Sequence, residues 1–283
     1  MRSVKYLVVA GAASLLSSAV FAADLPIMSP PQQQYYAPPP QDFGGWYLRG
    51  DIGMTNSSGK LHDDLFDTLP AGSTLTHMGE GFTGGTLYDI GVGYQFNSWF
   101  RADITGEYRS RVGFSGTDFS TFPGGGGTLS DVYQGGYTSW VGLANIYVDL
   151  GTWWCLTPFV GAGVGAAHIT TTGLQDSGLT FAPGAGSGNP SSYFANGAST
   201  TNFAWALHAG VAYRVTNNFT VELAYRYLDM GTAVHGFGSS FDGSNAGPSS
   251  FQFRDLTSQD VKLGVRWTCC DVPPPPPPLV TKG

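Results

Sequence analysis

The chain has 283 residues, which allows one domain of ordinary size or two small ones. Hydrophobic residues make up 42% of the sequence, enough for a folded domain, whereas charged residues make up only 12%, about half the usual share of a soluble protein. The net charge of −7 argues against nucleic acid as a partner. An aromatic content of 14% and 41 glycines favour strands and turns over a helical bundle.

Residues 1–23 have the features of a cleaved secretion signal. Arg2 and Lys5 form a basic start, an apolar run extends from Leu7 to Ala22, and the small side chains of Ala22 and Ala23 suit cleavage. The run is shorter than the ~20 residues that a membrane anchor needs. We therefore expect export from the cytoplasm, followed by a Pro/Gln-rich periplasmic linker over residues 24–44.

Eight segments between residues 45 and 268 alternate in polarity with the period of a strand that has two different faces. They are residues 46–54, 88–96, 100–109, 138–150, 158–167, 203–215, 219–227 and 260–267. Short links at 97–98, 151–157 and 216–218 alternate with long ones at 55–87, 110–137, 168–202 and 229–258. This pattern predicts an all-β fold, an eight-stranded antiparallel transmembrane up-and-down β-barrel with four long extracellular loops. Residues 269–283 then form a proline-rich C-terminal tail.

The charged residues of the eight segments all lie on one face of their strands, and the opposite faces carry none. A basic side chain facing lipid costs about 2 to 4 kcal/mol, so the apolar faces are expected to meet lipid. The charges are then expected to line a narrow lumen as a salt-bridge network that plugs most of it. This lumen network comprises Arg49, Asp51, Asp89, Arg101, Asp103, Glu107, Arg109, Asp149, Arg214, Glu222, Arg226, Asp260, Lys262 and Arg266.

Aromatic residues on the apolar faces fall near both ends of the strands, as expected of two membrane interfaces. Those near the short turns are Trp46, Phe96, Phe100, Phe219 and Trp267; those near the long loops are Tyr88, Tyr108, Trp140 and Tyr227. The rival is a water-soluble β-sandwich or a lipocalin-like barrel, which would bury the apolar face. The two aromatic belts and the secretion signal favour the outer membrane of a Gram-negative cell.

Four stretches of the sequence resemble a known family: the start at residues 23–26 (Ala-Asp-Leu-Pro), the first strand at 46–50, the glycine-rich segment at 158–165 and the last strand at 261–267. They are similar to the opacity-like outer-membrane β-barrel proteins of alpha-proteobacteria, a family that includes immunogenic surface antigens. The resemblance implies insertion by the barrel-assembly machinery and a role in envelope integrity or surface contact. Some relatives bind haem. This chain departs from many of them by continuing beyond Trp267.

The functional prediction is a non-enzymatic barrel of the cell surface that contributes to envelope integrity and surface contact. Its expected partners are outer-membrane lipid, lipopolysaccharide and host or other surface ligands bound through the loops. A small-solute porin and a haem-binding surface receptor are the alternatives, and a lipid-modifying hydrolase based on His168 with Thr170 or Thr171 is a more distant one. No catalytic residue or cofactor is predicted, and no metal-ligating set is assigned beyond one candidate group at residues 62–67.

Two further groups of residues are noted. The predicted loops carry many more acids than bases, and residues 62–67, with His62, Asp63, Asp64 and Asp67, are the best place for a divalent cation that bridges to lipopolysaccharide. The three cysteines, Cys155, Cys269 and Cys270, all map to the periplasmic end of the predicted barrel. A disulfide from Cys155 to Cys269 or Cys270 is open, because the oxidising compartment favours it and the distance around the ring opposes it.

Overall fold

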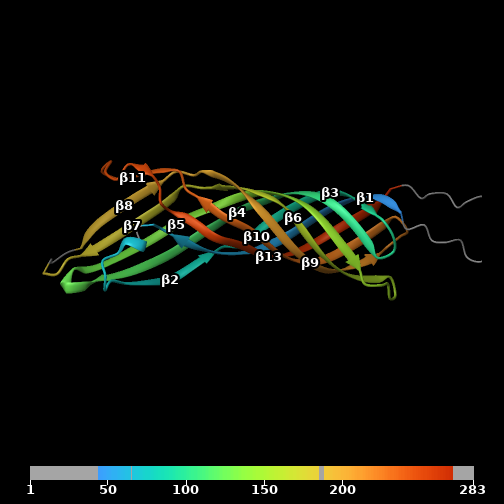
Figure 1. Cartoon of the computed structure of the whole chain (residues 1–283), viewed down its shortest axis with the longest axis horizontal. Helices are drawn as coiled ribbons and strands as arrows, with labels where there is room; N and C mark the ends of the chain where they lie inside the picture. Colours follow the sequence, from blue (N-terminus) through green and yellow to red (C-terminus); the bar gives the residue numbers. More distant parts are fainter. Residues whose placement is uncertain (1–43, 65, 185–187, 270–283) are drawn as a thin grey trace, which may run out of the picture. The chain divides into compact units, whose positions relative to one another are not determined.

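A computed structural model describes residues 44–64, 66–184 and 188–269 (Figure 1). The predicted signal peptide, nearly all of the Pro/Gln-rich linker and nearly all of the C-terminal tail lie outside these residues. Among the described residues, no helix combines the length and the hydrophobicity needed to cross a membrane.

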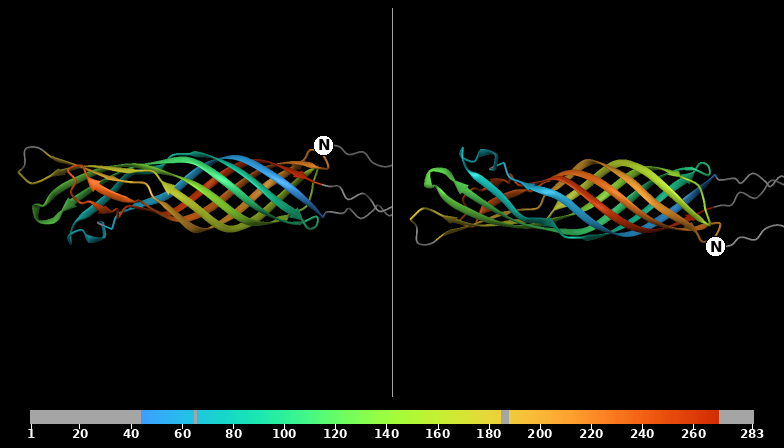
Figure 2. Two further views of the ribbon diagram at one scale, coloured as in Figure 1. Left: turned by 90° about the horizontal axis from the view of Figure 1, so that it is seen from above. Right: turned by 90° about the horizontal axis from the view of Figure 1, so that it is seen from below.

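All eight predicted strands are present, and they form a hydrogen-bonded antiparallel ring (Figure 2). Each ring strand pairs with the next one along the chain, and the last pairs with the first, from Tyr47 opposite Thr268 to His62 opposite Gln252. The ring strands are β1 (Gly45–His62), β3 (Gly85–Gln95), β4 (Phe100–Phe122), β5 (Gly127–Asp149), β6 (Leu156–Thr171), β9 (Ser199–Arg214), β10 (Phe219–Val234) and β13 (Gln252–Thr268).

The segments predicted to be long loops are mostly strands, so that prediction needs correction. Several ring strands continue into them, and β4 and β5 remain paired as far as Phe122 opposite Gly127. The same segments add β2 (Thr74–Phe82), β7 (Leu174–Phe181), β8 (Asn189–Ala195), β11 (Phe237–Ser240) and β12 (Gly247–Pro248), with short 3-10 turns η1 (Phe66–Thr68) and η2 (Pro123–Gly125). We call residues 56–84, 110–137, 168–202 and 229–257 the distal extension.

A β-bulge explains why alternation did not reveal the continuing strands. In β4 the inward positions are odd-numbered up to Arg109, but the register shifts between Arg109 and Val112, and the inward positions are then even-numbered. Asp255 of β13, with φ 55°, and Gly231 of β10, with φ 76°, mark similar irregularities in two other ring strands. A bulge inserts one extra residue and therefore exchanges the two faces of a strand.

The polarity of the two faces also reverses in the distal extension. There many of the inward side chains are apolar, and they form a buried core around Val112, Phe114, Tyr137, Leu228 and Phe253. The rings of Phe82, Phe114 and Phe253 meet at centroid distances of 4.9 to 5.3 Å. The extension is thus built like a water-soluble protein, with its hydrophobic core inside.

The ring itself has the opposite arrangement, with large apolar side chains on its outer surface. Ile90, Ile104 and Leu223 are 75%, 66% and 57% exposed, whereas their charged neighbours along the strands are buried. One row of ring-bearing side chains crosses neighbouring strands at the border with the extension. In this row Tyr88 lies opposite Tyr108, Tyr108 opposite Trp140, and Trp140 opposite His168. A second set of exposed aromatic residues lies near the short turns, and it includes Trp46, Phe96, Trp99, Tyr213 and Trp267.

Candidate functional site: the polar interior and the distal extension

The structure places thirteen of the fourteen predicted lumen residues inside the ring, where they form one connected set of ion pairs, here called the interior charge network. Its first part surrounds Glu222 of β10, whose carboxylate lies 3.6 Å from Arg49 Nη2 and 3.4 Å from both Arg101 Nη1 and Arg266 Nε. Arg49 also binds Asp51 at 2.8 Å and Asp103 at 3.0 Å. Arg101 Nε donates to Asp149 Oδ1 at 3.2 Å.

The second part of the network lies nearer the distal extension. Arg109 binds Glu107 and Asp260, each at 2.9 Å, and Arg226 binds the same two carboxylates at 2.6 and 2.7 Å. Two guanidinium groups therefore share two carboxylates in an arrangement that is at most 1% exposed. Lys262 joins the two parts, since its Nζ lies 2.8 Å from Asp51 Oδ2, contacts Asp89 and lies 3.8 Å from Glu107 Oε2.

Neutral polar side chains complete the network, and the sequence analysis did not single them out. Tyr47 donates its hydroxyl hydrogen to Asp103, and Arg49 donates to the hydroxyl oxygen of Tyr147. Asn145 donates to Asp103 at 2.8 Å and contacts His208 Nε2 at 3.2 Å. All of these residues occupy the polar face of their strands. Their position in the alternation could therefore have identified them as inward-facing. Selecting residues by formal charge missed them.

Arg214 does not belong to the interior charge network, and its inclusion was wrong. It is the last residue of β9 and is exposed, and no ion pair joins it to another described residue. The alternation of polarity assigns a residue to one face of the strand, but it does not show how far along the barrel axis the residue lies. At the end of a strand, a side chain on the inward face can reach water instead of the lumen.

The possible disulfide between Cys155 and Cys269 is not formed, because both residues are free thiols. Cys155 precedes β6 in the short turn from β5, whereas Cys269 follows β13. Two strands, β9 and β10, lie between β6 and β13 in the ring. The two cysteines are therefore attached to strands that are not neighbours. Cys270 lies outside the described residues.

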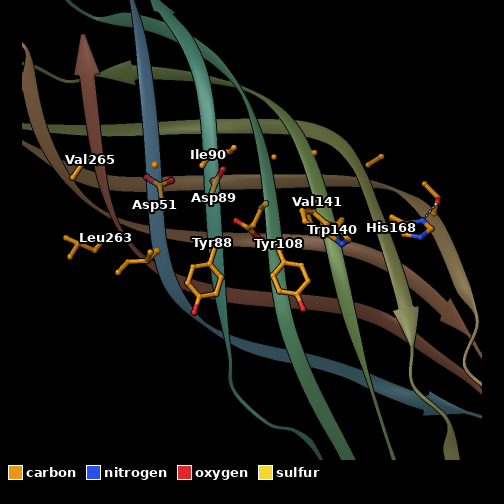
Figure 3. A pocket seen from close by; sticks show the side chains of 17 residues that line it. Asp51, Tyr88, Asp89, Ile90, Tyr108, Trp140, Val141, His168, Leu263 and Val265 are labelled. Carbon is orange, nitrogen blue, oxygen red and sulfur yellow. Dashed lines mark hydrogen bonds between the residues drawn. The ribbon is translucent and has the colours of Figure 1, made fainter. Parts of the chain in front are cut away.

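The outer wall of the ring contains an apolar groove where two glycines, Gly106 and Gly142, leave the space of their missing side chains open. Figure 3 shows Tyr108, Trp140 and His168 beside it, on β4, β5 and β6. His168 bonds to Thr201 of β9 through Nδ1 at 2.8 Å, and Thr170 bonds to Ser199. The pairing of His168 with Thr170 or Thr171 that a hydrolase would need is therefore not formed.

The acidic residues assigned to surface loops lie mostly on strands of the distal extension. His62 Nε2 lies 3.3 Å from Asp64 and 3.4 Å from Asp67, so the structure brings together three of the four residues of the predicted cation site. Asp63 points elsewhere and accepts a hydrogen bond from Ser250. Arg254 lies 3.6 Å from Asp64 and competes with a cation there. Cation binding at residues 62–67 remains a prediction.

Other acids face the inside of the distal extension and repel one another. Asp118 of β4 lies directly opposite Asp131 of β5 in the strand register, and Asp176 of β7 lies opposite the adjacent Tyr133. Burial, together with the charges of neighbouring carboxylates, raises the pKa of Asp131 to about 6 and that of Asp176 to about 7. The folded extension therefore holds these protons more tightly than the unfolded chain does.

This difference predicts that the distal extension is more stable in mild acid. Because both folded-state pKa values are raised, the stabilisation from proton binding is complete below about pH 4 and is lost as the pH rises to about 7. In EDTA-containing buffer, limited proteolysis of β7 and β8 should be faster at pH 8 than at pH 5. Asp176→Asn should slow cleavage at pH 8, whereas Asp242→Asn, at a fully exposed carboxylate in the same extension, should leave it unchanged. Equal cleavage at both pH values would contradict this electrostatic account.

Comparison with known proteins agrees with this architecture. Residues 10–268 match the family described as outer membrane protein beta-barrel domain. An uncharacterised protein of Brucella suis is 32% identical over 225 residues, which cover 75% of this chain and 76% of the relative. A putative adhesin of Rickettsia bellii is 28% identical over 232 residues, covering 81% and 85% of the two chains.

Among solved structures, Neisserial surface protein A is similar at 17% identity and a TM-score of 0.37, with 79% of this chain and 96% of that one covered. The match to the family extends over most of the sequence and includes every strand of the ring. The chain therefore belongs to the outer membrane protein β-barrel family and is a protein of the outer membrane.

Proposed function

We propose that the ring is an eight-stranded transmembrane up-and-down barrel whose distal extension stands outside the cell. The exposed apolar surface between the two aromatic rows supports placing the ring in the membrane. From Trp140 of β5 to Leu150, directly after the end of this strand, the chain advances by ten residue steps. At about 3.3 Å per residue and a tilt of about 40°, they span roughly 25 Å, the height of the apolar band of outer-membrane barrels.

The same barrel is proposed to have a closed lumen that stiffens the envelope and does not pass solutes. Two layers support this proposal, the interior charge network and, beyond it, the apolar core of the distal extension. Arg101, Arg109 and Arg226 are each at most 1% exposed, and so are Phe253 and Tyr137 above them. An eight-stranded ring leaves an interior that side chains nearly fill. A porin of this size would need water in place of these contacts.

The function that the geometry supports best is surface contact through the distal extension. The observation that carries it is a row of exposed apolar side chains on the outward face of this extension. Phe119 of β4 lies opposite Ser130 of β5, Ser130 opposite Leu179 of β7, and Leu179 opposite Pro190 of β8. The exposed members of this face, here called the distal apolar face, are Phe119, Val132, Leu179, Phe181, Phe194 and Phe237, at 36% to 55% exposure.

An apolar surface that faces water is energetically unfavourable, and a cluster of such side chains is typical of a binding site. Aromatic side chains supply much of the energy at protein interfaces because they bury a large area with few rotatable bonds. The putative adhesin of Rickettsia bellii matches this chain over most of its length, which favours the same class of function. Within the described part of the chain, no residue arrangement favours haem binding or hydrolysis as strongly: His208 and His235 are buried, and His168 bonds to a threonine.

Adhesion of bacteria that display the full chain tests this function. Cells with the protein are expected to attach to cultured epithelial cells more than cells with an empty vector. The double variant Phe194→Ser and Phe237→Ser should reduce attachment to the vector level at equal surface expression. Trp154→Ser is the matched control, because Trp154 is 95% exposed but lies in a short turn of the ring. Equal attachment of the double variant and this control, or no attachment by the original chain, would refute surface contact through the distal apolar face.

A further inference from the structure

Three side chains of types that can bind a metal meet on the inward face of β2 and β4, and one of them is the inward-facing Asp118 described above. His77 of β2 lies directly opposite Asp118 of β4, and its Nδ1 is 2.7 Å from Asp118 Oδ1. The same Nδ1 is 3.3 Å from Glu80 Oε1. One ligand atom from each residue fits within a group whose members are all less than 4.8 Å apart.

A β-bulge creates this group. In a regular strand His77 and Glu80, three residues apart, would point to opposite faces. The pairing of β2 with β4 shifts between Met78 and Gly81, and Gly79 adopts φ 62°, which glycine reaches without strain. The bulge therefore brings Glu80 to the side of His77. Gly116 of β4 leaves the room that the Glu80 side chain occupies, since a Cβ there would lie 3.0 Å from Glu80 Cγ.

The polar atoms of this group are not satisfied by the protein itself. Asp118 is 1% exposed, and its Oδ2 has no hydrogen-bond partner among the described residues. Glu80 Oε1 is buried and lacks a partner as well, because His77 Nδ1 can give only one proton and Asp118 is nearer. Buried carboxylate oxygens without partners are costly and point to a missing ligand.

The surrounding charges favour a divalent cation. Glu80 and Asp118 bring two carboxylates to this group, and the nearest acids in the register, such as Asp131 opposite Asp118, add further negative charge. Lys60 is the neighbouring cation that acts on Glu80. A bound divalent ion would neutralise both carboxylates.

We propose that His77, Glu80 and Asp118 form a zinc site that ties β2 to β4 in the distal extension. One imidazole nitrogen with two carboxylate oxygens is a ligand set that Zn²⁺ accepts, with bonds of about 2.0 to 2.2 Å. Ligand atoms of a tetrahedral zinc lie roughly 3.3 Å apart at these bond lengths. The pair His77–Glu80 has this spacing, and the closer pair His77–Asp118 opens when zinc replaces the proton on Nδ1. The His77 side chain is 46% exposed, so the fourth position can be taken by water.

The site has a structural consequence for β2. Among the described strands β2 pairs only with β4, so it is an edge strand of the extension. Edge strands are held by half the usual hydrogen bonds and open more easily. A metal that joins His77 and Glu80 to Asp118 adds a cross-strand link at this edge. Zinc is therefore expected to slow amide exchange over residues 74–82.

Zinc titration of the tag-free mature protein in detergent micelles tests the proposal. Calorimetry after EDTA treatment should show uptake of one zinc ion per chain at pH 7.5. His77→Ala and Glu80→Gln should each weaken binding by at least about tenfold, and zinc should slow amide exchange in residues 74–82 of the original chain but not of these variants. Heat-modified gel mobility shows that each variant has folded.

Two histidine variants serve as matched controls. His62→Ala removes the histidine of the other His–carboxylate group in the extension, and His168→Ala removes one bonded to Thr201. Both should keep zinc uptake and the slowed exchange. The proposal is overturned if the original chain takes up no zinc, if His77→Ala binds it as tightly as the original chain, or if His62→Ala rather than His77→Ala abolishes uptake.

Discussion

Arg226→Met is expected to destabilise the protein by about 3 to 5 kcal/mol, the cost of breaking a buried ion pair by removing one partner. The guanidinium of Arg226 donates to Glu107 and Asp260 at 2.6 to 2.9 Å, and all three residues are at most 1% exposed. Methionine retains much of the volume but leaves two carboxylates to share Arg109. Urea-induced unfolding in lipid vesicles, followed by tryptophan fluorescence, measures the change.

Arg214→Met is the matched control for this experiment. Arg214 carries the same side chain on the neighbouring strand β9, but it is exposed and lies outside the interior charge network. Its replacement should change the unfolding free energy by less than about 0.5 kcal/mol. If the two variants were equally stable, the network would contribute nothing to the fold, and the closed lumen proposed above would lose its main support.

Ile104→Arg should cost about 2 to 4 kcal/mol, because it places a cation on the outer surface midway between two aromatic positions of β4. Ile104 is 66% exposed and lies four residues from both Phe100 and Tyr108. In a lipid environment the guanidinium loses its hydration, whereas on a water-exposed surface the same change is nearly neutral. The comparison is made by reversible unfolding in vesicles.

Val132→Arg provides the control for this second effect. Like Ile104, Val132 is a β-branched residue on the outward face of a ring strand, with 42% of its surface exposed. Unlike Ile104, it belongs to the distal extension. Because we place that extension in water, the substitution should change stability by less than about 0.5 kcal/mol. A large penalty at Val132 together with none at Ile104 would mean that the membrane-spanning band has been assigned to the wrong part of the strands.

The ring could be predicted from sequence because lipid and a polar interior impose opposite demands on alternate residues. In β4, for example, Arg101, Asp103 and Glu107 are buried while Ile104 and Tyr108 face outwards. This alternation is the simplest signal that a strand can carry. It identified all eight ring strands and thirteen residues of the interior charge network, although the predicted strands were too short on the side of the distal extension.

The distal extension could not be predicted in the same way, for two physical reasons. Outside the lipid-facing band the outward side chains are no longer required to be apolar, so Thr117 and Ser130 resemble loop residues. The bulge after Arg109 then exchanges the faces, so that Phe114 faces inwards although the odd-numbered parity of the strand points elsewhere. The polarity pattern therefore ends where the membrane-facing surface ends, while the backbone pairing continues.

The proposed zinc ligands were hidden by the same kind of irregularity. A spacing of three between His77 and Glu80 suggests a helix or no contact at all in a strand. Only the bulge at Gly79 brings the two side chains to one face, and only the register places Asp118 beside them. The group at residues 62–67 was easier to see, because its residues are close together in the sequence.

Nitroxide scanning of β4 in lipid vesicles tests the central claim most directly, that the ring is apolar outside and charged inside. Single cysteines at residues 100–108 of a chain without native cysteines would carry the spin labels. Labels at the even-numbered positions should be accessible to oxygen dissolved in lipid. Those at the odd-numbered positions should be immobile and shielded, in line with the burial of Arg101, Asp103, Thr105 and Glu107. Uniform accessibility, or lipid contact at the odd-numbered positions, would contradict the arrangement of the barrel.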